Sequence, residues 1–152
     1  MSLEDDIAFL ESVPTLALLG REALRIIAIG AENRYVHSGN VLFSEGEPAD
    51  AGYVVQEGSF ELATQARLPA ATVGPGTLLG ETALVAESTR PVTATALEPS
   101  TVIRIPRTLF MRMLEGYPEA ARRLRDNMAA RVQSSLRDLS GVRAVLDAGG
   151  GS

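Results

Sequence analysis

The chain has 152 residues, of which 45% are hydrophobic and 22% are charged, and its formal net charge is −5. This length and composition predict one globular domain with a buried core and exclude a disordered chain. The acidic balance disfavours a nucleic-acid-binding surface, and the absence of cysteine excludes disulfides and thiolate metal sites. No apolar run approaches the roughly 20 residues that span a membrane, and the first residues are acidic where a secretory signal is basic. We therefore expect a cytoplasmic protein that binds neither nucleic acid nor membrane.

Two short helices are predicted in residues 1–30. Apolar residues recur at helical spacing over 3–11, and Ser2 precedes them as a suitable N-cap. A second helix is predicted over 21–29, and Gly30 ends it. We expect both helices to pack against the part of the chain that follows.

Residues 31–106 have the pattern of a β domain. Short apolar segments alternate with turns rich in Gly, Pro, Asn and Asp, which predicts strands over 33–36, 41–44, 51–56, 59–64, 70–73, 92–98 and 101–105. Short strands with turn signals at this density favour a β-sandwich or a jelly roll. Glycines within the turns are interpreted as residues that set the fold rather than bind a ligand.

The segment from Gly76 to Ala96 predicts a binding site. A glycine before a short helix lets backbone amides approach an anion, and Gly80 precedes a segment long enough for one or two helical turns. A polar turn over 87–89 leads to Arg90, whose planar donors suit a phosphate, whereas Glu81 needs a partner with hydroxyls. A ligand with both a phosphate and a ribose hydroxyl satisfies the two side chains. The alternative is a structural ion pair between them at a turn.

Residues 107–147 are predicted to form a hinge and a dimer helix. A short amphipathic helix over 108–115 ends at Gly116, and a long helix opens at Glu119, after Pro118, and runs to about 146. Within the long helix a seam recurs at steps of three and four, made of Val132, Ser135, Leu139, Val142 and Leu146. The seam predicts a homodimer through a coiled coil, and the alternative is a helix packed on its own barrel. Residues 148–152 are expected to be a flexible tail.

Two separated stretches resemble the cyclic-nucleotide-binding domain family, which includes the catabolite activator protein and the regulatory subunits of cyclic-AMP-dependent protein kinase. Residues 80–84, Gly-Glu-Thr-Ala-Leu, and residues 90–93, Arg-Pro-Val-Thr, resemble its phosphate-binding cassette, placed here at 79–93. Residues 39–62 resemble the strands and turns that precede this cassette in the family. The resemblance implies a mainly β fold with α, in which N-terminal helices and a long C-terminal helix flank a jelly-roll (double-stranded β-helix) barrel. It also implies a bound cyclic nucleotide, and we expect cyclic AMP in preference to cyclic GMP.

The resemblance also implies roles for individual residues. Glu81 would accept a hydrogen bond from the ribose 2′-hydroxyl, Gly80 and Ala83 would offer backbone amides, and Arg90 would pair with the cyclic phosphate. A polar residue of the long helix would contact the purine. The residues expected at the ligand are Gly80, Glu81, Thr82, Ala83, Arg90, Pro91, Val92, Thr93 and Ser135.

Two positions depart from the family pattern. Pro91 has no backbone N–H to offer to the phosphate, and Val92 replaces a usual alanine. Loss of one hydrogen bond to a charged group costs about 1.5–3 kcal/mol. The departure predicts weaker binding than usual or a degenerate site.

We expect a sensor without catalytic activity, cofactor or metal. The sequence shows no pairing of a nucleophile with a base, and the single histidine, His37, is interpreted as a turn residue. The chain stops too soon after the long helix for a helix-turn-helix, so we expect a stand-alone regulatory domain that acts on an unknown downstream protein. One alternative is a degenerate fold that acts as a dimerisation or interaction module. Another is a truncated N-terminal domain of a catabolite-activator-type transcription regulator.

Overall fold

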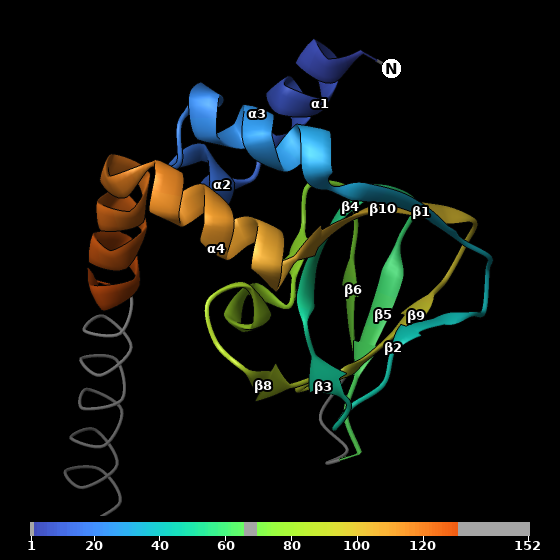
Figure 1. Ribbon diagram of the computed structural model, residues 1–152. Coiled ribbons are helices and arrows are strands. Elements are labelled where there is room, and N and C mark those ends of the chain that lie inside the picture. The colour runs from blue at the N-terminus through green and yellow to red at the C-terminus, as the bar shows by residue number, and fades with distance from the viewer. Residues whose placement is uncertain (1, 66–69, 131–152) are drawn as a thin grey trace, which may run out of the picture.

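The computed structural model describes residues 2–65 and 70–130, and it shows helices gathered at one end of a β structure (Figure 1). Three helices precede the strands: α1 (Leu3–Glu11), α2 (Pro14–Ala17) and α3 (Arg21–Gly30). A short 3-10 helix, η1 (Glu81–Leu84), interrupts the strands, and α4 (Arg107–Gly116) follows them. The strands are β1 (Glu32–Val36), β2 (Val41–Phe43), β3 (Pro48–Ala49), β4 (Ala51–Glu57), β5 (Phe60–Ala63), β6 (Ala71–Val73), β7 (Leu78–Leu79), β8 (Ser88–Thr89), β9 (Thr93–Ala96) and β10 (Ser100–Pro106).

The strands form two four-stranded sheets and one two-stranded ribbon, and each strand runs antiparallel to its neighbours. Among the described residues, one sheet has the order β1-β10-β4-β7 and the other the order β2-β9-β5-β6, while β3 pairs with β8. Neighbours in each sheet are mostly distant in sequence, as in Greek-key and jelly-roll folds. The predicted fold class, a jelly-roll-like β structure flanked by helices, is confirmed.

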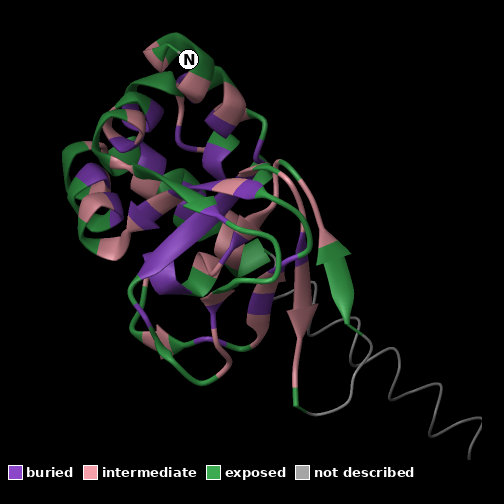
Figure 2. Cartoon of the chain, turned by 90° about the vertical axis from the view of Figure 1, so that its right-hand side faces the viewer, coloured by how far each residue is buried: buried purple, intermediate pink, exposed green. Residues whose placement is uncertain are grey.

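Strands β4 and β10 are buried on both faces, because they separate two hydrophobic clusters. On one side, Val55 and Val102 point into the cluster between the sheets. On the other side, Val54, Ile103 and Ile105 belong to the cluster under the helices. This is why β4 is a continuous apolar run rather than an alternating one. Figure 2 shows buried purple segments running through both the helices and the central strands.

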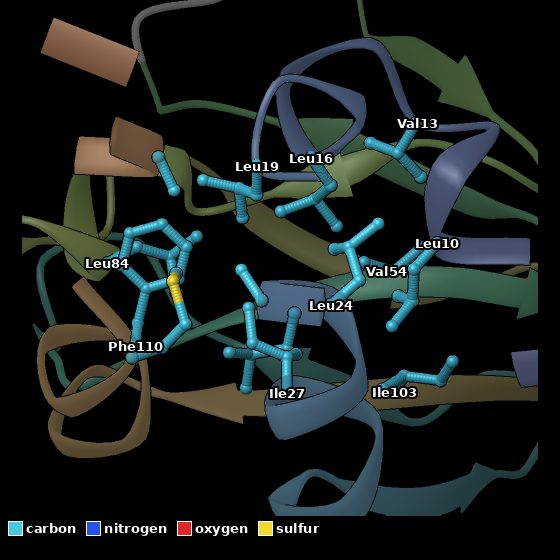
Figure 3. Packing of buried hydrophobic residues seen from close by; sticks show 14 of the residues in the cluster. Leu10, Val13, Leu16, Leu19, Leu24, Ile27, Val54, Leu84, Ile103 and Phe110 are labelled. Carbon is cyan, nitrogen blue, oxygen red and sulfur yellow. The ribbon is translucent and has the colours of Figure 1, made fainter. Parts of the chain in front are cut away.

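The helices cover the sheet through one shared core. Leu10 of α1, Leu16 of α2 and Ile27 of α3 are each 0% exposed and belong to the cluster that includes Val54 (Figure 3). Helix α1 begins as predicted, since the Ser2 hydroxyl accepts a hydrogen bond from the Asp5 N–H at 3.2 Å. The side chain of Asp5 in turn accepts from the Ser2 N–H, which completes a capping box.

Some short elements differ from the predictions. Val13-Pro14 ends the first helix as expected, but Pro14 also opens the additional helix α2, where proline at the first position costs no hydrogen bond. Residues 87–89 were expected to form a polar turn, whereas Ser88–Thr89 form strand β8 against β3. Two-residue strands have no periodicity that a sequence pattern can reveal.

The C-terminal helices are separated at Tyr117. Helix α4 ends there, with φ −133° and ψ 76°, and residues 118–130 are helical again, one residue earlier than predicted. Figure 1 shows this second segment turning sharply from α4. The predicted seam over 132–146, with Ser135, and the tail over 148–152 lie outside the described residues. Within the described ranges, no helix has the length and apolar character needed to cross a membrane.

Candidate ligand-binding site

Arg90 is a buried arginine whose backbone is fixed on both sides. Its N–H donates to the Glu47 carbonyl at 2.8 Å, and its carbonyl accepts from the Gly46 N–H at 2.8 Å. The side chain turns inward, and the residue is only 4% exposed. The turn before β3 therefore holds Arg90 directly after β8, in the segment that leads to β9.

The guanidinium of Arg90 lies over two neighbouring aromatic rings, and one of its nitrogens has no hydrogen-bond partner among the described residues. Its central carbon is 4.4 Å from the ring centre of Phe43 and 5.4 Å from that of Tyr53. Within the described residues, its buried Nη1 has no hydrogen-bond partner. Burial holds the pKa of Arg90 below its usual value, although Tyr53, Asp50 and Glu47 act to raise it. An arginine remains charged under these conditions, so the site presents a cation whose donor is unsatisfied.

Gly80 allows the close approach of Arg90 to the backbone. It has φ +76°, in the left-handed region, and it precedes η1. A Cβ at this position would lie 2.4 Å from Nη1 of Arg90 and 3.2 Å from the Ala51 carbonyl oxygen. The backbone conformation therefore favours glycine, and a side chain at this position would have to displace the Arg90 guanidinium.

Helix η1 confirms the short helical turn predicted after Gly80. Ala83 and Leu84 are buried and anchor the turn, whereas Thr82 is exposed and Glu81 is half-buried. The Ala83 N–H donates to the Gly80 carbonyl at 3.0 Å, so in this structure it is used within the turn rather than offered to a ligand. The Glu81 carboxylate accepts a hydrogen bond from the Thr15 hydroxyl at 3.4 Å.

A cavity of about 250 Å³ brings six of the predicted site residues together. Gly80, Glu81, Thr82, Ala83, Arg90 and Pro91 line it, with Ala49, Ser88 and Thr89 of the β3–β8 ribbon. Sequence reasoning missed the ribbon residues and the two aromatic rings. Pro91 is exposed at the rim.

Two further predicted residues lie elsewhere. Val92 is half-buried against the cluster between the sheets. The Thr93 hydroxyl accepts from the Glu45 N–H at 2.9 Å and therefore stabilises the turn before β3. Neither residue lines the cavity, because Val92 packs against the core and Thr93 bonds to a turn. Their assignment to the ligand site stays a prediction.

Arg107, the first residue of α4, joins the cavity wall to the C-terminal helices. Its Nη1 lies 3.0 Å from the Ala49 carbonyl, 3.3 Å from the Ala83 carbonyl and 3.0 Å from the Ala86 carbonyl. These carbonyls belong to the ribbon and to the segment around η1. Leu84 of η1 also shares a cluster with Phe110 of α4 (Figure 3). A shift of η1 must therefore disturb the start of α4.

A family model described as a cyclic nucleotide-binding domain matches residues 33–117, which is more than half of the chain. The chain belongs to this family. The resemblance to this family that the sequence motifs indicated is confirmed, and the matched residues include all those that line the cavity. Cyclic nucleotide-binding domains are regulatory rather than catalytic modules.

Known relatives contain this domain in proteins of different size. An uncharacterised NTE family protein of Mycobacterium tuberculosis is 34% identical over 109 residues, which cover 72% of this chain but only 19% of that protein. The structure of a cyclic nucleotide-binding-like protein of Brucella abortus is 39% identical, with a TM-score of 0.65, and 73% of this chain covers 98% of it. The N-terminal domain of a Streptomyces coelicolor transcriptional regulator is 29% identical, with a TM-score of 0.75, over 83% of this chain and 91% of that one.

Proposed function

We propose that this chain is a regulatory domain that binds cyclic AMP and has no catalytic activity of its own. The observation that supports a cyclic nucleotide is Nη1 of Arg90, a buried donor without a partner among the described residues, in a cavity that Gly80 and Glu81 also line. A cyclic phosphate is a monoanion, and it would supply the missing acceptor. Glu81 would then accept a hydrogen bond from the ribose 2′-hydroxyl.

The energetics favour an anion at this position. A buried cation that lacks partners is costly. Removing one partner of a buried ion pair typically destabilises a protein by about 3–5 kcal/mol, because the other charge is left uncompensated. Phosphate oxygens accept from arginine in a planar, charge-assisted geometry. The aromatic rings of Phe43 and Tyr53 hold the guanidinium in place before a ligand arrives, which lowers the entropy lost on binding.

The test is calorimetric titration with cyclic AMP and cyclic GMP, using 5′-AMP as the acyclic control. Arg90→Ala should weaken cyclic AMP binding at least ~100-fold, since about 3 kcal/mol of charge-assisted bonding is lost. Arg25→Ala is the matched control, because it removes the same charge from an exposed side chain of α3. Equal cyclic AMP affinity in all three proteins would refute the site. An absence of binding to the wild-type chain would favour the degenerate fold.

The regulatory output would pass through α4. Ligand drawn towards Arg90 and Glu81 would shift η1, and the contacts of Arg107 and Leu84 would transmit that shift to α4. A ligand can bias only an equilibrium between two arrangements, so the second arrangement must differ at this junction. We place the hinge at Tyr117, where the helix is interrupted.

A homodimer through the helix that begins at 118 remains part of the proposal. An apolar groove of about 530 Å³ supports it, lined by Val85, Leu114, Ala121, Leu124, Arg125, Met128 and Ala129. The output itself is proposed to lie in a protein partner or in another part of a larger regulator, as in relatives of which this domain is one portion. A cytoplasmic location stays a prediction.

A second candidate is an interaction module that has lost its ligand. Pro91 favours it, because this residue offers no N–H beside the phosphate position. The same titration separates the two candidates, since only the first requires heat of binding that disappears with Arg90.

A further inference from the structure

The carboxylate of Glu81 is contacted from a distant part of the chain. Thr15 lies in α2, among the N-terminal helices, and its hydroxyl donates to Oε1 of Glu81 at 3.4 Å in a part-buried setting. The contact joins the helical layer to the wall of the cavity. Nothing in the family resemblance or in the predicted site points to Thr15.

Packing on both sides fixes the position of Thr15. Val13 is 2% exposed, Leu16 is 0% exposed, and Pro14 restricts the backbone at the first position of α2. Leu16 belongs to the same cluster as Leu84, the last residue of η1 (Figure 3). The element that carries the hydroxyl and the element that carries the carboxylate are therefore built on one core.

The hydrogen bond from Thr15 uses only part of the acceptor capacity of a carboxylate. An ionised carboxylate offers about four lone-pair positions on two oxygens, so it can accept from Thr15 and also from a ligand hydroxyl. A side chain that is already held by a hydrogen bond also loses less rotamer entropy when a ligand binds to it.

We infer that Thr15 is a positioning residue that orients Glu81 towards a ligand hydroxyl and so sets the preference for ribose over deoxyribose. The inference rests on the proposed function. Because Thr15 itself does not line the cavity, it would act on the ligand only through the carboxylate. Its loss should therefore affect ligands with a 2′-hydroxyl and spare those without one.

The experiment compares cyclic AMP with 2′-deoxy cyclic AMP by calorimetry on the wild type, Thr15→Val and Thr15→Ser. Valine keeps the shape but removes the hydroxyl, whereas serine keeps the hydroxyl and loses only a methyl group. Thr15→Val should weaken cyclic AMP binding about three- to tenfold and leave 2′-deoxy cyclic AMP within about twofold. Thr15→Ser should keep the wild-type ratio of the two affinities. Thermal melts of all three proteins verify folding.

A merely structural role for Thr15 predicts an equal loss for both nucleotides, and that result would overturn the inference. A wild-type protein that binds the two nucleotides equally would also overturn it, because Glu81 would then make no contact with the hydroxyl, while the phosphate site would stand. If the wild type bound neither nucleotide, the proposed function would fail and this inference with it.

Discussion

Replacing Gly80 by alanine has two effects that can be measured separately, one on stability and one on ligand binding. The first comes from backbone strain, since a non-glycine residue in the left-handed region costs about 1–2 kcal/mol. The second comes from lack of space, because the new Cβ would lie 2.4 Å from Nη1 of Arg90. The guanidinium is the end of a flexible side chain and can move away, so the clash itself should add little to the loss of stability. It would, however, displace the group that is proposed to hold the phosphate.

Gly76 provides the matched control. It has φ +88°, and a Cβ there would meet nothing within 4 Å. Gly80→Ala and Gly76→Ala should therefore lose similar stability, with melting temperatures lowered by about 2–8 °C. Only Gly80→Ala should weaken cyclic AMP binding, by about ten- to a hundredfold, the value of one or two charge-assisted hydrogen bonds.

Calorimetry and thermal melts on the two variants test this reasoning. Equal cyclic AMP affinity in both variants, with Gly80→Ala still folded, would show that the position of Nη1 does not matter for binding. A far larger loss of stability in Gly80→Ala would show that Arg90 cannot move, and the 3.2 Å approach to the Ala51 carbonyl would then dominate.

Three further predictions concern the rim, the junction and the assembly. Pro91→Ala should leave cyclic AMP affinity unchanged or raise it, because an N–H is restored beside the phosphate; a lower affinity in calorimetry would mean that Pro91 holds Arg90 in place. In hydrogen exchange, cyclic AMP should protect residues 78–92 and 107–130 of the wild type, whereas Arg107→Met should limit protection to the first range. Arg112→Met, on an exposed position of α4, should behave as the wild type, and identical behaviour of both variants would exclude Arg107 as the link. Light scattering at high micromolar concentration should give a dimer, and a monomer would contradict the proposed role of the helix after 118.

Local patterns were enough to predict most of the elements. Helix α1 has its predicted bounds because its N-cap and its apolar spacing are both encoded within nine residues. The short helix after Gly80 was also predictable, since this glycine stops an apolar run and a Thr-Ala-Leu-Val-Ala segment suited to a helical turn follows at 82–86. The longer strands were found to within a residue or two at their ends for the same reason.

Contacts between distant residues were beyond such patterns. Phe43 and Tyr53 meet Arg90 only because β2, β4 and the end of β8 converge on the inside of the barrel. The hydrogen bond from Thr15 to Glu81 depends on how α2 packs over η1, which no spacing in the sequence records. The ribbon of β3 and β8 consists of two residue pairs and needs the fold to bring them together.

Because β4 and β10 are buried on both faces, they limit how small a fragment of this domain can be transferred to another protein. The family match begins at residue 33, yet the outer faces of Val54, Ile103 and Ile105 are covered by helices from residues 3–30. A fragment cut to the matched range would expose that apolar surface and invite self-association. Grafting this domain into another protein therefore requires the N-terminal helices as well, and the graft should be cut outside them.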